Sequence, residues 1–171
     1  PAQRLGDDFT VTGLHSGLDG QSLRLNYGAA ISEVFEISLL GRHQQRNAAT
    51  AAAAALRLRE LGLMISDSAL RAGLSAARWP GRFEVMCKAP MLIMDGSHNT
   101  HGMAALRQTL DELLPAEDIL WVAGMMADKD VAGMLEYLKG RTVSLYACSP
   151  QLPRALPAQD VADAGANAGF S

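Results

Sequence analysis

The sequence predicts an α/β chain in two consecutive parts, and three observations lead to this prediction. Residues 9–41 alternate apolar and polar side chains, as strands with one buried face do. Residues 43–61 contain an alanine-rich run, and residues 83–147 alternate between short apolar runs and helical patterns. The change of pattern near residues 77–80 predicts a boundary. Beyond it, we expect parallel strands that are joined by right-handed helical crossovers.

The first part begins with a predicted hairpin. Phe9–Thr12 and Leu23–Tyr27 alternate in polarity around Gly17-Leu18-Asp19-Gly20, a typical turn sequence. A third strand is expected over 33–40, before Gly41.

Two helices follow this hairpin. Seven of the eight residues 48–55 are alanine, the best helix former, which predicts a helix over 43–61 that stops at Gly62. A second helix is expected over 66–76, with Ser66 or Asp67 as its cap.

The second part alternates strands with helices. The pattern predicts strands over 83–87, 91–95, 119–124 and 142–147, and helices over 101–114, over 129–139 and near Pro157.

The most informative segment lies where the apolar run Met91–Met94 meets Asp95-Gly96-Ser97-His98-Asn99. A short buried strand that ends on a carboxylate, turns on glycine and opens a helix is how open α/β sheets build ligand sites. Asp95 is placed to accept hydrogen bonds from a sugar diol. Ser97 and Asn99 are candidates to cap the helix, whose free N–H groups favour anions.

Composition excludes several classes of protein. Hydrophobic residues make up 49% of the 171 residues and charged residues 19%, which suits a packed core. The net charge of −3 and the lack of a basic stripe disfavour nucleic-acid binding. No apolar run approaches the roughly 18 residues that a membrane span needs. Cys87 and Cys148 lack metal-ligand spacing and are expected to be reduced thiols packed in or beside strands of a cytosolic protein.

Five motifs occur along the chain in a fixed order. They are Gly41-Arg42-His43-Gln44-Gln45-Arg46-Asn47-Ala48-Ala49, Trp79-Pro80-Gly81-Arg82-Phe83-Glu84, Asp95-Gly96-Ser97-His98-Asn99, Gly124-Met125-Met126-Ala127-Asp128-Lys129-Asp130 and Pro153-Arg154-Ala155. This order closely resembles folylpolyglutamate synthase, a family that is often bifunctional with dihydrofolate synthase and belongs to the ATP-dependent Mur ligase superfamily. The resemblance covers residues 33–160, and it departs from the family at Thr100, where proline is usual.

The resemblance implies a domain organisation. Residues 1–78 would form the end of a Mur-type ATPase central domain, with β hairpin strands and the Ala-rich helix. Residues 79–171 would form a Rossmann-like, parallel-sheet C-terminal domain that is incomplete. The sequence holds no Gly-x-x-x-x-Gly-Lys-Ser/Thr phosphate loop, and the ligands of Mg²⁺ are expected outside this chain. No metal ligand is assigned within it, and the chain is expected to come from a longer protein.

The resemblance also implies four nucleotide-binding residues. Asn47 would contact ATP, Arg82 would grip its phosphates, Asp95 would bind the ribose hydroxyls, and His98 would contact nucleotide or glutamate. Local sequence alone leaves structural alternatives open. These are a helix-start hydrogen bond in the first turn for Asn47, a surface charge or interdomain salt bridge for Arg82, a turn or N-cap for Asp95 and a helix-terminus residue for His98. No residue is assigned a catalytic role.

Asp128-Lys129-Asp130 has a structural interpretation as well. A solvated loop that starts a helix needs no other reason for acidic residues near the helix N-terminus.

The implied activity is an ATP-dependent carboxylate–amine ligation. L-glutamate would be joined to a folate or to dihydropteroate through an acyl phosphate, in a cytoplasmic and monomeric parent enzyme. This chain by itself is expected to be inactive. Two alternatives stay open, namely another Mur-type ligase of peptidoglycan synthesis and a stand-alone nucleotide-binding or interaction module.

Overall fold

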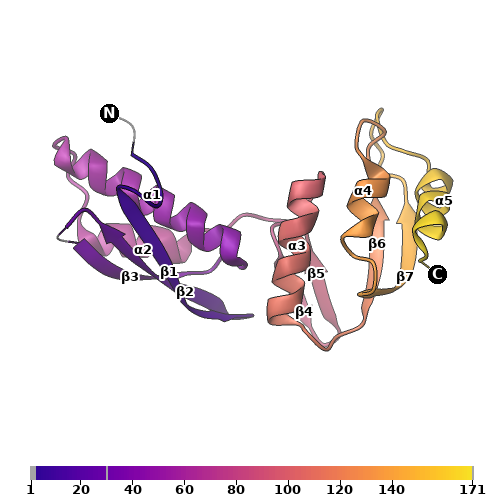
Figure 1. The fold of residues 1–171 in the computed structure, drawn as a ribbon, viewed down its shortest axis with the longest axis horizontal. Helices are drawn as coiled ribbons and strands as arrows, with labels where there is room; N and C mark the ends of the chain where they lie inside the picture. The colour runs from indigo at the N-terminus through magenta and orange to yellow at the C-terminus, as the bar shows by residue number, and fades with distance from the viewer. Residues whose placement is uncertain (1–2, 30, 171) are drawn as a thin grey trace. The chain divides into compact units, whose positions relative to one another are not determined.

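The computed structural model describes residues 3–29 and 31–170. The chain divides into two compact units, Pro1–Gly96 and Ser97–Ser171, each of which combines helices with strands (Figure 1). The α/β fold class predicted from the sequence is therefore confirmed. The assignment of residues 1–78 and 79–171 to two domains stays a prediction.

A three-stranded antiparallel sheet opens the first unit. Its strands are β1 (Phe9–Gly17), β2 (Gly20–Tyr27) and β3 (Ile31–Ile37), in that spatial order. The predicted hairpin is confirmed, since only two residues join β1 to β2. β3 ends three residues earlier than expected because its last partner, Gln21, lies next to the first residue of β2.

Helix α1 (Arg42–Glu60) packs its small side chains on this sheet. Ala49, Ala52, Ala53 and Leu56 are buried at helical spacing and join the core formed by the strands. The helix ends in a Schellman motif, in which the amide of Gly62 donates to the carbonyl of Arg59 and the amide of Leu63 donates to that of Leu58. Gly62 has φ +100°, so the predicted glycine stop is confirmed.

Helix α2 (Asp67–Ala76) follows as predicted. The side chain of Ser66 caps it by accepting a hydrogen bond from the amide of Ala69 at 3.1 Å. Leu70 of α2 is buried in the core of this unit, and half-buried Leu74 packs against that core.

Two short strands end the first unit, and here two predictions are wrong. β4 (Glu84–Lys88) and β5 (Met91–Met94) pair as an antiparallel hairpin, whereas parallel strands were expected here. Two residues link these strands, whereas a parallel connection needs a crossover of about a dozen or more. β5 is also not buried, because Met91, Leu92 and Met94 are all exposed.

The second unit contains the parallel pair. It comprises α3 (Thr100–Leu113), β6 (Ile119–Gly124), α4 (Val131–Glu136), β7 (Thr142–Cys148) and α5 (Ala158–Ala168), with β6 and β7 parallel.

Helix α4 is shorter than the predicted range 129–139. Asp130 caps it, since its carboxylate accepts a hydrogen bond from the amide of Gly133 at 3.0 Å. After Glu136 the backbone hydrogen bonds change to the 3₁₀ pattern. The amides of Tyr137, Leu138 and Lys139 each donate to the carbonyl three residues earlier.

Helix α5 packs on one face of the parallel pair. Its Gly165 allows a close approach, because an added Cβ would lie 2.4 Å from a methyl carbon of Leu145 on β7. Phe170, just past the helix, meets Trp121 of β6 edge to face, with 6.2 Å between ring centroids.

Both cysteines lie in strands, Cys87 in β4 and Cys148 in β7, and both are free thiols. Their location in strands is as expected, but both side chains are exposed and not packed. Within the described residues, every helix is too short or too polar to cross a bilayer.

Candidate functional site

The candidate site centres on the turn that carries Arg82. Trp79-Pro80-Gly81-Arg82 has proline and glycine at the two central positions, and Gly81 has φ +70°. The amide of Arg82 donates to the carbonyl of Trp79 at 3.3 Å. Proline followed by a residue with positive φ is the signature of a type II turn. The sequence therefore places Arg82 at the exit of a tight turn, directly before the hairpin β4–β5.

Two carboxylates hold this turn. Glu84 accepts a hydrogen bond from the amide of Gly81, and Asp95 accepts one from the amide of Phe83, each at 2.8 Å. The amide of Gly96 returns a bond of 2.7 Å to the carbonyl of Gly81. Two hydrogen bonds, one donated by the turn and one accepted by it, thus join the turn to the end of β5. Asp95 lies at the carboxyl end of β5, where the sequence predicted it.

A cleft of about 550 Å³ lies beside the turn, and all its lining residues belong to the first unit. Arg78, Arg82 and Lys88 are its cations. Arg78 is engaged, since it donates to the side chain of Ser38 and to the carbonyls of Ser75 and Ala77.

The other two cations of the cleft, Lys88 and Arg82, differ in whether they have a partner. Lys88 pairs with Asp19, and this hydrogen bond holds the pKa of the Asp19 carboxyl below its usual value. The guanidinium of half-buried Arg82, in contrast, makes no hydrogen bond or ion pair with any residue of the described chain. It is the cation that the cleft leaves available for an anionic ligand.

Asn47 lies apart from this cleft. It is exposed in the second turn of α1, not in the first turn as predicted, and its amide donates to the side chain of Gln44 at 3.1 Å. The helix begins at Arg42 because Gly41, with φ +98°, ends the preceding extended segment. The carbonyl of Gly41 accepts hydrogen bonds from the amide of Gln44 and from the buried side chain of Gln21.

His98 belongs to the second unit and is exposed on the loop before α3. Residues 95–98 are not helical, so His98 precedes the helix and its N-cap Asn99. Asn99 is the N-cap of α3, since its side chain accepts a hydrogen bond from the amide of Gly102 at 2.8 Å. The capping role predicted for Asn99 is confirmed.

The second unit brings two more of the sequence motifs together. The amide of Ala127 donates to the carbonyl of Arg154 at 2.9 Å, and the side chain of Asp128 lies 3.0 Å from Lys129 and 3.5 Å from Arg154. The hydrogen bond from Lys129 holds the pKa of Asp128 below its usual value, with a smaller contribution from the charge of Arg154. With Asp130 as a helix cap, the structural interpretation of Asp128-Lys129-Asp130 accounts for what is observed.

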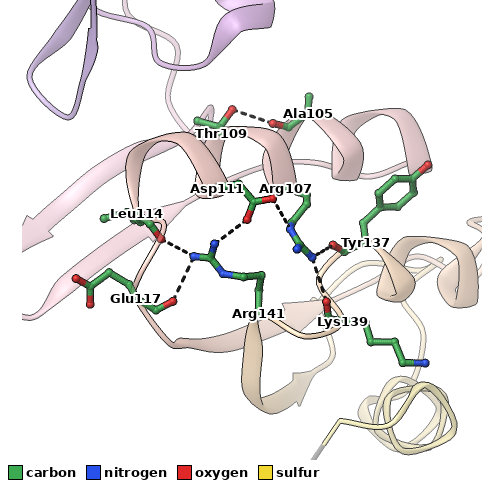
Figure 2. A network of polar contacts seen from close by, with 9 residues as sticks. All are labelled: Ala105, Arg107, Thr109, Asp111, Leu114, Glu117, Tyr137, Lys139 and Arg141. Carbon is green, nitrogen blue, oxygen red and sulfur yellow. Dashed lines mark hydrogen bonds and ion pairs between the residues drawn. The ribbon is translucent and has the colours of Figure 1, made fainter.

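Sequence reasoning assigned no role to two features. Glu84 closes the motif Trp79-Pro80-Gly81-Arg82-Phe83-Glu84, but its bond to the amide three residues earlier needs the turn geometry to be seen. The second feature is the network around Arg107, Asp111 and Arg141 shown in Figure 2. Its only sequence signal is the spacing of Arg107 and Asp111, four residues apart on α3.

The candidate site thus combines a tight turn, the guanidinium of Arg82 and a cleft in an α/β chain. Residues 81–170 match the family "Mur ligase, glutamate ligase domain", and this chain belongs to that family.

Similar proteins agree with this membership. The chain is 32% identical over 165 residues to a dihydrofolate synthase/folylpolyglutamate synthase of Bacillus subtilis, covering 96% of this chain and 38% of that protein. It is 34% identical to a folylpolyglutamate synthase of Lacticaseibacillus casei, covering 90% of this chain and 36% of that protein.

Solved structures share the fold. Mycobacterium tuberculosis folylpolyglutamate synthase complexed with ADP matches with a TM-score of 0.83 and 31% identity, covering 96% of this chain and 36% of that one. Escherichia coli FolC in complex with DHPP and ADP matches with a TM-score of 0.81 and 30% identity, covering 96% and 37%. The chain thus spans a little more than a third of the length of these relatives.

Proposed function

We propose that this chain is part of an ATP-dependent ligase that joins L-glutamate to a folate or to dihydropteroate. The observation that carries the proposal is the unpartnered guanidinium of Arg82, held beside a cleft in a member of the Mur ligase family. Relatives named folylpolyglutamate synthase, two of them solved with ADP, support the choice of substrates.

The chemistry explains why an arginine is needed. A carboxylate is a poor electrophile, so its oxygen first attacks the γ-phosphorus of ATP, which gives an acyl phosphate and ADP. The amino group of glutamate then attacks the acyl carbon, loses a proton, and phosphate leaves. Negative charge concentrates at the γ-phosphate in the first step, and the fork of Arg82 would offset it through paired hydrogen bonds.

The proposal gives Asp95 a second role. Its carboxylate accepts a hydrogen bond from the amide of Phe83 at 2.8 Å, and a carboxylate can accept several hydrogen bonds. In this proposal the carboxylate also accepts a hydrogen bond from a ribose hydroxyl of ATP. Asn47 and His98 stay predictions as nucleotide contacts.

Magnesium accompanies ATP in such reactions and would supply charge neutralisation at the phosphates. Among residues 3–29 and 31–170, no three His, Cys, Asp or Glu side chains gather into a group that would hold a metal ion. The cytoplasmic location and the monomeric state also stay predictions.

The test uses the complete ligase and its Arg82→Ala variant. We expect formation of ADP that depends on both folate and glutamate, and a loss of roughly a hundredfold in kcat/KM for ATP in the variant. Arg24→Ala is the matched control, because Arg24 is an exposed arginine on β2 outside the cleft. Turnover of a muramyl acceptor with no turnover of any folate would reject the folate assignment in favour of a peptidoglycan ligase.

A second experiment addresses the chain by itself. We expect the purified 171-residue chain to show no glutamate-dependent release of ADP, since its sequence holds no phosphate loop to keep a triphosphate in attack geometry. Calorimetry with ATP distinguishes the alternative. Micromolar binding of ATP by this chain would support a stand-alone nucleotide-binding module.

A further inference from the structure

We propose that Glu84 and Asp95 are positioning residues that clamp the turn 79–83 and so aim the guanidinium of Arg82 at the anionic substrate. The inference rests on the proposed function, in which Arg82 meets the phosphates of ATP. Glu84 holds the amide of Gly81, and Asp95 has a structural role in holding the amide of Phe83 besides its proposed contact with ribose.

The backbone amides of the turn are already hydrogen-bonded within the protein. Three consecutive amides are occupied, since Gly81 donates to Glu84, Arg82 to the carbonyl of Trp79 and Phe83 to Asp95. Consecutive free amides can form a nest that binds phosphate. Here they are already used, so the group that this turn offers to an anion is the side chain of Arg82.

The backbone of the turn explains why a clamp is needed. Gly81 has φ +70° and Phe83 has φ +45°, so two of three consecutive residues occupy the left-handed region. Phe83 is not a glycine, and such a conformation persists only where the surroundings impose it. The ring of Phe83 is buried at 3% exposure, which anchors the residue, while Asp95 holds its amide.

The hairpin β4–β5 sets the spacing of the two carboxylates. Glu84 is the first residue of β4 and is directly opposite Met94, the last residue of β5. Asp95 follows immediately, so both acids come from the open end of one hairpin and face the same turn. A slip of one residue in this register would move Asp95 away from Phe83.

Amide hydrogen exchange in the 171-residue chain tests whether the clamp exists. We expect Glu84→Ala to speed the exchange of the Gly81 amide, and Asp95→Ala that of the Phe83 amide, each by about tenfold or more. Glu84→Gln should keep slow exchange at Gly81, because a side-chain amide oxygen still accepts a hydrogen bond. Glu36→Ala, which removes an exposed acid from β3, is the matched control and should change neither amide. Unchanged exchange in Glu84→Ala and Asp95→Ala would overturn the clamp.

A double-mutant cycle in the complete ligase tests whether the clamp acts through Arg82. We expect Glu84→Ala to lower kcat/KM for ATP by about tenfold with Arg82 present, and by less than about twofold in the Arg82→Ala background. Glu84→Gln should restore most of the loss. An equal loss in both backgrounds would show that Glu84 does not act through Arg82 and would overturn the inference.

The two experiments separate this inference from the proposed function. An unsubstituted enzyme with no folate- and glutamate-dependent use of ATP would overturn the proposed function, and with it the catalytic part of the inference. Amide exchange would still decide whether the two carboxylates clamp the turn.

Discussion

Arg141 donates a hydrogen bond from Nη1 to Oδ1 of Asp111 across 2.6 Å, and this contact ties the loop before β7 to the last turn of α3 (Figure 2). Nη2 of the same guanidinium donates to the carbonyls of Leu114 and Glu117. The other carboxylate oxygen of Asp111 accepts from Arg107 at 2.7 Å. Arg141 thereby satisfies a carbonyl that α3 leaves without a partner in its own helix, and it places a positive charge at the negative end of that helix.

We predict that Arg141→Ala destabilises the second unit by about 2–3 kcal/mol, because the side chain is only 12% exposed and its bonds are charge-assisted. Urea unfolding measures the change, followed by the fluorescence of Trp121 in a chain whose other tryptophan, Trp79, is replaced by phenylalanine. Arg141→Lys should keep less than half of the stability that Arg141→Ala loses, since an ammonium group cannot reproduce the planar set of donors of a guanidinium. Lys139→Ala is the control, as its ion pair with Glu136 is exposed and should contribute roughly 0.5 kcal/mol or less. Equal effects of the alanine substitutions at 139 and 141 would contradict the structural role of the network.

Asp95 is expected to contribute to nucleotide binding more than to the chemical step. In the complete ligase, Asp95→Ala should raise KM for ATP more than it lowers kcat, because a ribose contact is made equally in the ground state and the transition state. Asp95→Asn separates the two roles, since its amide oxygen still accepts from Phe83. Steady-state kinetics at varied ATP concentration measures both constants. An unchanged KM in Asp95→Ala would remove Asp95 from the ribose.

Two glycines of the first unit form a matched pair for stability. An added Cβ meets no atom within 4 Å at either Gly62 or Gly73, so the substitutions differ mainly in backbone conformation. Gly73 lies inside α2, and Gly73→Ala should stabilise the unit by about 0.5–1 kcal/mol. Gly62 has φ +100° at the end of α1, and Gly62→Ala should destabilise it by about 1 kcal/mol or more.

Thermal and denaturant unfolding of the 171-residue chain compare these two variants directly. Shifts of the same sign for both would mean that the Schellman end of α1 does not form as described.

Asp128 provides a prediction about pH. Its pKa lies below the ordinary value of 3.8, first because of the hydrogen bond from Lys129. A carboxylate with a lowered pKa in the folded state stabilises that state fully above its unfolded pKa, and this contribution is lost as the pH falls through the folded value. The contribution should therefore be constant near neutrality and disappear only below about pH 4.

Carbon NMR of the Asp128 carboxyl measures this titration. Lys129→Met should raise the midpoint toward 3.8, and Arg154→Met should raise it by less, because Arg154 is a minor cause of the shift. An Asp128 midpoint at or above 3.8 in the unsubstituted chain would contradict the ion pair.

Local sequence predicted the elements whose ends depend on nearby residues. Ser66 caps α2, Asn99 caps α3, and Gly62 ends α1, because each of these contacts spans only a few residues of chain. The order of the five motifs also sufficed to place the chain in the Mur ligase family. The position of Asp95 at the end of β5 was likewise predicted from the apolar run before it.

Local sequence did not predict how strands β4 and β5 pair. The run Met91–Met94 has the composition of a buried parallel strand, yet it forms an exposed hairpin with β4. Composition describes a strand, but its partner and its burial depend on what the rest of the chain places beside it. The same limit applied to Arg107, Asp111 and Arg141, whose network joins residues up to 34 positions apart.

The sequence by itself determined where helices form, the caps of α2 and α3, the glycine stop of α1, the family and the presence of an arginine after a Pro-Gly turn. Only the tertiary structure decided that Glu84 and Asp95 hold that turn, and that Arg78 and Lys88 are engaged while Arg82 is not. The physical reason is the separation along the sequence of the groups that interact. Caps and turns are set by neighbouring backbone groups, whereas the partner of a charged side chain is set by whichever distant segment the fold brings within about 3 Å of it.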